Sequence, residues 1–333
     1  MTRQTGIMSS RIEADRLTPY DGLGELLQIH GQPFDPPNGY LDYALYGTAA
    51  EGPARVVLDG LEGDVTLSHG IHYLDELAAA GDWRRFFMEA GAIRSRLSGN
   101  MAALFGEYAL PHVAGMPLMA LAAGIPAIWR HGGTRSALRA VKRRVGSKTA
   151  AASRSASRRL LISSDLERTV GWNEMMRDEP HESPVSEQQA HIQYLKGAYV
   201  PSVLEFTHAN ARYFGLEARH PMFDLRLIKL AVGMRPGLKL HDGWNRYALR
   251  EAVAGMVPDD VRWRPEKATL APNFDLKMAN LAKESIDVAR DAGKSGLAEF
   301  LDMERFAELA DRKRFRKLWP ALVLALYLKN RDE

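Results

Sequence analysis

The sequence predicts an α/β fold, with a small parallel sheet near the N-terminus and a mainly helical remainder. The strand is indicated by the apolar run Ala54-Arg55-Val56-Val57-Leu58, which follows the helix-breaking Glu51-Gly52-Pro53 and has the length of a buried strand. From Tyr73 onward, apolar residues instead recur every three or four positions, the spacing of one helix face. We therefore expect a single domain over residues 1–333, α/β over 1–70 and mainly helical over 71–333.

The other elements follow from the same patterns. Helices are predicted over residues 22–30 and 40–50, separated by a proline-rich loop, over 192–214, and at the C-terminus in the apolar run 321–328. Pro221 biases His220 away from helical conformation. Asp224 and Asp242 each precede an apolar-periodic stretch, which predicts that they are N-caps.

The composition excludes several kinds of chemistry. The chain contains no cysteine, so disulfides, a thiol nucleophile and thiolate metal ligands are excluded. Its N-terminus is polar and lacks the apolar core of a signal peptide. The nearly uncharged stretch Ala109–Trp129 is interrupted by prolines, which favours a buried helix pair over a membrane span. We expect a cytoplasmic protein with no membrane partner.

Basic residues are concentrated in one part of the chain. No acidic residue lies between Tyr108 and Ser164, whereas lysine and arginine are frequent from 130 to 160. A mobile basic loop over 130–160 is the favoured interpretation, because its Ser/Ala-rich part has little apolar surface to bury. Binding of nucleic acid is the weaker alternative, since no aromatic residue for base stacking lies between Trp129 and Trp172. Charge reversal at four arginines would test it: Arg143, Arg144, Arg158 and Arg159.

The predicted strand runs directly into a loop of glycines and carboxylates, Asp59-Gly60-Leu61-Glu62-Gly63-Asp64. In open α/β sheets, ligands bind at the carboxyl edge of the strands, so this loop is a candidate binding site. By itself the motif is weak, because a glycine-containing turn after a strand more often has a structural explanation. His69 follows the loop and could face the pocket as a catalytic residue. A histidine in such a place more often has a structural hydrogen-bonding role.

A longer pattern lies between Asn210 and Phe274. Its positions run in the order Glu217-x-Arg219-x-Pro221-Met222-Phe223-Asp224-x-Arg226-Leu227-Ile228, then Lys239, then Leu249-Arg250-Glu251, then Trp263-Arg264-x-x-Lys267. In order and spacing this stretch resembles the C-terminal synthetase domain of the asparagine synthase family. The family pattern is E-x-R-x-P-F-x-D-x-R-L-[IV], followed by a lysine, L-R-E and W-R-x-x-K. A chance match over such a length is not expected.

The resemblance implies an adenine-nucleotide α-hydrolase-like (ATP pyrophosphatase) fold and a carbon–nitrogen ligase of the asparagine synthase (glutamine-hydrolysing) type. In that family ATP adenylylates a carboxylate, usually the side chain of aspartate, and ammonia then displaces AMP to form an amide. Related enzymes that close lactam rings use the same chemistry on another carboxylate. The implied cofactors are ATP and Mg²⁺, and the implied small-molecule partner is a carboxylate substrate.

The resemblance also implies which residues form the nucleotide site. Gly60 and Gly63 fall on the family's pyrophosphate-binding loop, and Asp64 falls on the aspartate that holds Mg²⁺ there. Glu62 is a weaker candidate for a second metal ligand. Lys267 matches the lysine that in relatives faces the α-phosphate and the tetrahedral intermediate, so it is the predicted catalytic cation.

Three further residues of the pattern have alternative roles. Glu217 and Arg219 are interpreted either as an ion pair that supports the site or as contacts to the substrate. Trp263 is interpreted as a packing residue rather than as a stacking surface for adenine.

The chain also departs from the family. Leu61 and Val65 replace two of the family's loop acids, and the S-G-G-x-D-S pyrophosphate loop is absent from the sequence. The N-terminal glutaminase half, whose nucleophile is a cysteine, is absent too. Three explanations stay open: an N-terminally incomplete piece of a longer synthetase, a split enzyme with a glutaminase or pyrophosphate-loop partner chain, or a non-catalytic relative that keeps the fold for binding.

Overall fold

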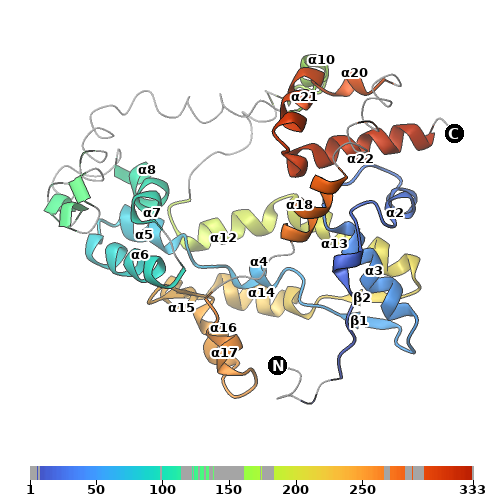
Figure 1. Ribbon diagram of the computed structural model, residues 1–333. Helices are drawn as coiled ribbons and strands as arrows, with labels where there is room; N and C mark the ends of the chain where they lie inside the picture. Colours follow the sequence, from blue (N-terminus) through green and yellow to red (C-terminus); the bar gives the residue numbers. More distant parts are fainter. Residues whose placement is uncertain are drawn as a thin grey trace.

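The chain is described by a computed structural model, shown as a ribbon in Figure 1. The described residues are 6, 8–97, 100–113, 122, 124–126, 128–130, 133–134, 138, 161–172, 174, 184–265, 271–281, 287 and 296–331. The predicted basic loop over 130–160 lies almost wholly outside these ranges, as do residues 114–121, 123 and 127 of the predicted helix pair between Ala109 and Trp129.

A two-stranded parallel sheet joins the two motif regions of the sequence. β1 (Val56–Leu58) precedes the glycine–carboxylate loop, and β2 (Glu217–Arg219) begins the second motif, with Val57 opposite Ala218. Successive side chains of a strand point to opposite faces, and only one face of β1 is covered. Val57 packs on an apolar cluster, whereas Val56 and Leu58 are 39% and 67% exposed. The predicted parallel sheet is confirmed, but the prediction that this strand is buried was wrong.

Helices α3 (Gly39–Ala50) and α13 (Tyr199–Tyr213) pack against the covered face of the sheet. Buried Tyr46, Ala211 and Leu216 form this small cluster. The chain turns from α13 into β2 at Gly215, whose φ of +70° is a conformation that glycine adopts without strain. The sheet is therefore held by one helix from each half of the sequence.

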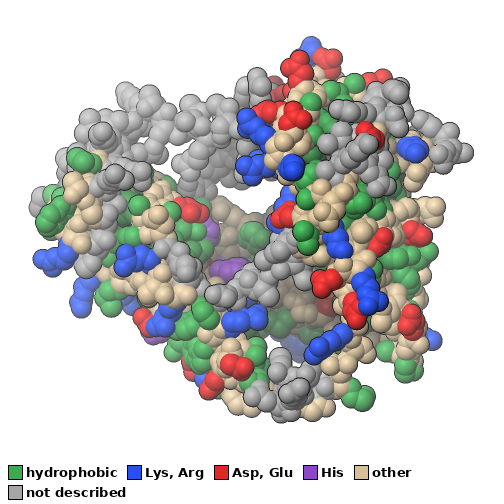
Figure 2. All heavy atoms as spheres, viewed as in Figure 1, with side chains coloured by type: hydrophobic (Ala, Val, Ile, Leu, Met, Phe, Trp, Pro, Cys, Tyr) green, Lys and Arg blue, Asp and Glu red, His purple; other side chains and the backbone are tan. Residues whose placement is uncertain are grey.

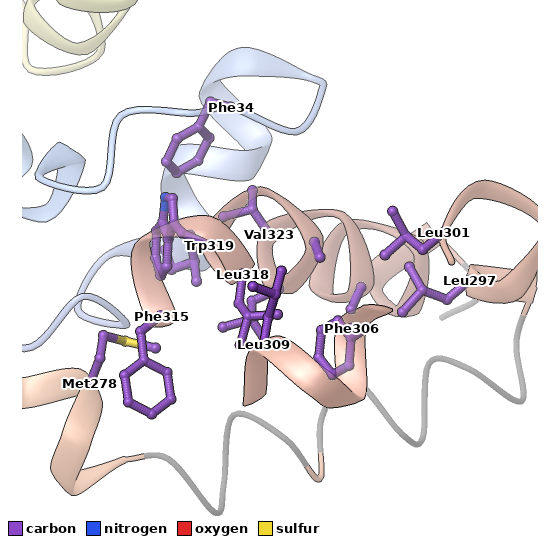
Figure 3. Close-up of a cluster of buried hydrophobic side chains, with 14 of the residues drawn as sticks. Phe34, Met278, Leu297, Leu301, Phe306, Leu309, Phe315, Leu318, Trp319 and Val323 are labelled. Carbon is purple, nitrogen blue, oxygen red and sulfur yellow. The ribbon is translucent and has the colours of Figure 1, made fainter. Parts of the chain in front are cut away.

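A large apolar core surrounds the C-terminal helix α22 (Phe315–Arg331), as Figure 3 shows. Helices α2 (Leu23–His30), α18 (Ala271–Asn280) and α21 (Met303–Asp311) contribute to it. Trp319 is 2% exposed and meets Phe274 edge to face. The predicted helix over 22–30 and the predicted buried C-terminal helix are confirmed.

A second helical cluster lies on the opposite side of the molecule in Figure 1. It is built from α5 (Tyr73–Ala79), α6 (Trp83–Leu97), α7 (Met101–Leu104), the π-helical turn η2 (Phe105–Ala109) and α8 (Leu110–Val113). Its centre is aromatic, with Phe86 and Phe105 both fully buried. The helical prediction from Tyr73 onward is confirmed. Within the described ranges, none of the helices combines the length and the apolar character needed to cross a bilayer.

Three helices connect these clusters: α4 (Gly63–Leu67), α12 (Glu187–Lys196) and α14 (Leu225–Val232). α4 packs against both α12 and α14. The helix predicted over 192–214 is broken at Gly197–Ala198, which separates α12 from α13. Four short elements lie elsewhere or at the edge of this region: η1 (Ala14–Arg16), η3 (Pro221–Phe223), which packs against α4, and α10 (Ser164–Thr169) and α20 (Ala298–Phe300), which pack against each other.

A small hairpin follows α14. It consists of α15 (Pro236–Lys239), β3 (Leu240–His241) and β4 (Trp244–Asn245), followed by α16 (Tyr247–Ala252) and α17 (Asp259–Arg262). The hairpin turn rests on α6, where a Cβ added to Gly243 would lie 2.5 Å from the Ala92 backbone. Asp224 caps α14, as predicted, by accepting a hydrogen bond from the Arg226 amide at 2.8 Å. Asp242 does not cap a helix, because it occupies the hairpin turn.

Candidate active site

The glycine–carboxylate loop lines a cavity of about 560 Å³. Residues 60–65 form one wall, residues 68–72 continue it, and α12 contributes His191 and Tyr194 from the other side. Figure 2 shows histidine side chains (purple) inside the hollow at the centre of this face. Four residues predicted from the sequence therefore meet at one cavity: Gly60, Glu62, Gly63 and Asp64.

The loop is held at the carboxyl end of β1 by Asp59. Its Oδ1 accepts hydrogen bonds from the Leu61 amide at 3.0 Å and from His220 Nδ1 at 2.8 Å. Because His220 directly follows β2, this contact ties together the ends of the two strands. His220 Nε2 lies 3.0 Å from His208 Nε2, so His220 also contacts the neighbouring helix α13.

Asp64 is engaged by an arginine that comes from the hairpin. Arg246 Nη1 lies 2.5 Å from Asp64 Oδ1, and Arg246 Nη2 donates to His69 Nε2 at 3.0 Å. Arg246 has a left-handed backbone (φ +50°), and its Nε is buried without a hydrogen-bond partner in the described structure. The guanidinium is thus fixed at the loop by two contacts while one donor is unsatisfied.

Glu62 is the least satisfied carboxylate of the loop. It is 7% exposed, and among the described residues its Oε2 has no hydrogen-bond partner. Burial raises the pKa of Glu62, and the nearby charge of Asp64 raises it further. A cation placed between Glu62 and Asp64 would oppose both causes and lower the pKa of Glu62.

These donors fit Mg²⁺ bound together with a nucleotide. Mg²⁺ is typically held by one or two carboxylates and by the substrate's phosphates, rather than by a complete cage of protein ligands. Asp64 and the orphaned Glu62 Oε2 supply that number of carboxylates, and no cluster of three or more ligands exists within the described residues. The arrangement therefore suits a metal that arrives with the phosphates.

A buried polar network lies beneath the cavity. Lys239 and Glu187 have fully buried side chains, and Lys239 Nζ lies 3.4 Å from Glu187 Oε1 and 3.0 Å from His191 Nδ1. His191 Nε2 donates to the Val65 carbonyl at 2.9 Å, and Ser68 Oγ donates to Glu187 Oε1 at 2.6 Å. α12 therefore holds the middle and the C-terminal cap of α4, the helix that carries Asp64.

Burial decides the protonation of this network. It lowers the pKa of His191, and the adjacent Lys239 ammonium lowers it further. Burial also lowers the pKa of Lys239, while Glu187 opposes that shift. The contacts agree with this direction, because Nε2 donates to the Val65 carbonyl and Nδ1 faces the Lys239 ammonium as an acceptor.

The remaining predicted residues lie elsewhere. Glu217 and Arg219 form the expected ion pair at 2.8 Å, but both side chains are 59% exposed on β2 and neither lines the cavity. Trp263 packs against Trp244, with ring centroids 5.1 Å apart, in agreement with a packing role. Lys267 lies outside the described residues.

A match to a protein family agrees with this geometry. Residues 4–329, nearly the whole chain, match the asparagine synthase family. The chain belongs to the asparagine synthase family. Neither the curated proteins nor the solved structures contain a match to it.

Sequence reasoning missed several residues of the site. Arg246, Glu187 and His191 reach the cavity or its floor from elements distant in sequence, and only the packing of α12 and the hairpin brings them together. His72, which also lines the cavity, was missed although one signal was available: His72 and Asp75 are three positions apart in a helical stretch, a spacing that places side chains on the same face.

A pH prediction concerns Asp42, which lies in α3 beside the loop. Burial, followed by the charge of Asp59, raises the pKa of Asp42 to about 6. A carboxyl whose pKa is raised on folding stabilises the fold below its unfolded pKa, and this contribution is lost as the pH rises through the folded pKa. Between about pH 4 and pH 7, the wild type is thus expected to lose on the order of 2 kcal/mol of stability relative to Asp42→Asn. Urea unfolding of both proteins across this range measures the difference, and parallel curves would contradict it.

Proposed function

We propose that this chain is an ATP- and Mg²⁺-dependent ligase domain that adenylylates a carboxylate and then forms an amide. The observation that carries the proposal is the cavity at the end of β1. The Gly60–Asp64 loop lines it with the carboxylates of Glu62 and Asp64, and Arg246 pairs with Asp64. Family membership supports the reaction class, and we include the adenine-nucleotide α-hydrolase-like fold in the proposal. Aspartate is the first carboxylate to test, with a lactam-forming substrate as the alternative.

The proposal assigns roles to the loop residues, to Arg246 and to Lys267. The backbone of Gly60 and Gly63 would bind the phosphates, and Asp64 and Glu62 would hold Mg²⁺, which would offset the negative charge of the phosphates. Arg246 exchanges Asp64 for a phosphate oxygen when nucleotide enters. Lys267 is the proposed cation for the α-phosphate and the acyl oxygen.

The origin of the nitrogen and of the remaining phosphate contacts belongs to the same proposal. The S-G-G-x-D-S loop and a cysteine nucleophile are absent from the given sequence, so we propose that both functions come from a glutaminase or pyrophosphate-loop partner chain or from another part of a longer synthetase. In that case the chain alone would bind Mg·ATP weakly, and addition of the partner would tighten binding.

Calorimetric titration with Mg·ATP tests the proposal. The wild type is expected to bind saturably and only with Mg²⁺ present, and Asp64→Asn is expected to weaken binding by roughly 10- to 100-fold, because a metal ligand is lost. Lys267→Ala is expected to weaken binding as well. Asp165→Asn is the matched control, since Asp165 is an exposed α10 residue that pairs only with Arg168 among the described ion pairs.

The alternative function is a non-catalytic binding subunit. It is favoured by one observation: Arg246 already neutralises Asp64 in this structure. A wild type that binds no Mg·ATP, and whose Arg246→Ala variant also binds none, would support this alternative over the ligase.

A further inference from the structure

A buried aspartate in α5 holds two imidazole rings. Asp75 is 4% exposed, and its Oδ2 accepts a hydrogen bond from His72 Nδ1 at 2.8 Å. Its Oδ1 accepts a second hydrogen bond from His112 Nε2, also at 2.8 Å. The side chains of Asp75 and His112 are 5% and 9% exposed, whereas that of His72 is 38% exposed. A buried carboxylate therefore orients one accessible imidazole.

The accessible imidazole faces the candidate active site. His72 lines the same cavity as Asp64, beside Ser68 and Ile71. Because Nδ1 donates to Asp75, the neutral ring carries its proton there, and its Nε2 is an acceptor that has no hydrogen-bond partner within the described ranges. Tyr108 meets the ring edge to face, with centroids 5.6 Å apart, and limits its rotation.

The other histidines of the cavity have different surroundings. His191 uses both ring nitrogens, one with Lys239 and one with the Val65 carbonyl. His69 Nε2 accepts from Arg246 and lies 3.9 Å from Asp64. Among the described histidines that line the cavity, His72 is the one whose ring a buried carboxylate orients through one nitrogen while the other has no described hydrogen-bond partner.

The charges around His72 strengthen it as a base. Burial acts to lower the pKa of His72, but the hydrogen bond and charge of Asp75, with the charges of Glu187 on α12 and Glu107 on η2, raise it overall. His112 on α8 also faces Asp75, so a proton on His112 would oppose this effect.

We infer that His72 is the general base of amide formation, with Asp75 as its positioning residue. The inference rests on the proposed function. The amine nitrogen attacks the carbonyl carbon of the acyl-adenylate, the new C–N bond forms, and the C–O bond to the phosphate breaks with its electron pair leaving on AMP. The proton lost by the nitrogen passes to His72 Nε2 and from there to solvent. An amine nucleophile needs this proton removed before a stable amide results.

The first experiment requires no reaction. Long-range ¹H–¹⁵N spectra of the histidine rings in the full chain, recorded across neutral pH, report both tautomer and titration. We expect neutral His72 to carry its proton on Nδ1, and its pKa to fall in Asp75→Asn. An Nε2–H tautomer, or a titration that Asp75→Asn leaves unchanged, would overturn the inference. If Asp75→Asn does not fold, the tautomer of the wild type still decides.

The second experiment separates the two half-reactions. With Mg·ATP, L-aspartate and ammonium chloride, exchange of labelled pyrophosphate into ATP reports adenylylation, and amide production reports the step that uses the base. His72→Gln is expected to lower the ratio of amide formation to exchange by roughly 10²- to 10⁴-fold. Asp75→Asn is expected to lower it less and to shift the acidic limb of its pH profile. His241→Gln, an exposed hairpin histidine outside the cavity, is the matched control.

The outcomes distinguish the inference from the function on which it rests. An active wild type whose ratio is unchanged in His72→Gln would overturn the base and leave the ligase proposal standing. A wild type without pyrophosphate exchange would count against the ligase proposal, and the ring spectra would still support or overturn the His72–Asp75 pair.

Discussion

Replacing Lys239 by methionine is expected to lower the free energy of unfolding by about 3–5 kcal/mol, because a buried carboxylate would lose its cation. Lys239 and Glu187 both have fully buried side chains. In the variant, Glu187 keeps only the hydrogen bonds that do not involve Lys239, such as that from Ser68 Oγ, and its other oxygen already has no partner among the described residues. Methionine fills a similar volume, so the loss reports charge rather than packing. Urea unfolding measures it.

A second variant tests the reason for that loss. Adding Glu187→Gln to Lys239→Met removes the unpaired charge, and the double variant is expected to regain more than half of the lost stability. Lys229→Met is the matched control, because Lys229 is exposed on α14 and its replacement is expected to change stability by less than about 0.5 kcal/mol. Equal losses in the single and double variants would contradict the buried-charge explanation and point to packing.

Replacing Gly70 by alanine is expected to cost about 2–4 kcal/mol. Gly70 has a φ of +71°, so any side chain adds strain of about 1 kcal/mol. A Cβ at this position would also lie 2.7 Å from the backbone of Lys239 and Leu240, which requires the loop or the hairpin to shift and adds about 1–3 kcal/mol. Because the same loop carries Ser68 and His69, Mg·ATP binding is expected to weaken together with stability.

Gly215→Ala separates the two costs. Gly215 has nearly the same φ, +70°, but a Cβ there would meet no atom within 4 Å. This variant is expected to show only the strain, about 1 kcal/mol. Thermal or urea unfolding of the pair measures the difference, and equal losses at the two positions would show that close approach to Lys239 does not matter.

The loop and the fold class were predictable from local patterns. The run 54–58 contains a strand, and the glycines and acids that follow it line the cavity because a chain leaving a strand must turn at the sheet edge. The burial of that strand was not predictable in the same way. An apolar run has the same appearance whether one or both faces of its strand are covered, and here the helices cover one face.

Tertiary packing determined which residues form the buried network beneath the cavity and which basic groups reach the site. Lys239 was visible only as a motif position, and nothing local indicates that its ammonium meets Glu187 and His191, which are 52 and 48 positions away in sequence. Arg246 reaches Asp64 only because the hairpin rests on α6 through Gly243.

By itself, the sequence determined the family, the loop that carries the acids and most of the helices, because these depend on residue type and on spacing within one segment. Only the tertiary structure decided which cation meets Asp64, which histidine of the cavity is oriented by a buried carboxylate and which charges are buried. Those properties depend on distances between segments that are remote along the chain, and local spacing carries no information about such distances.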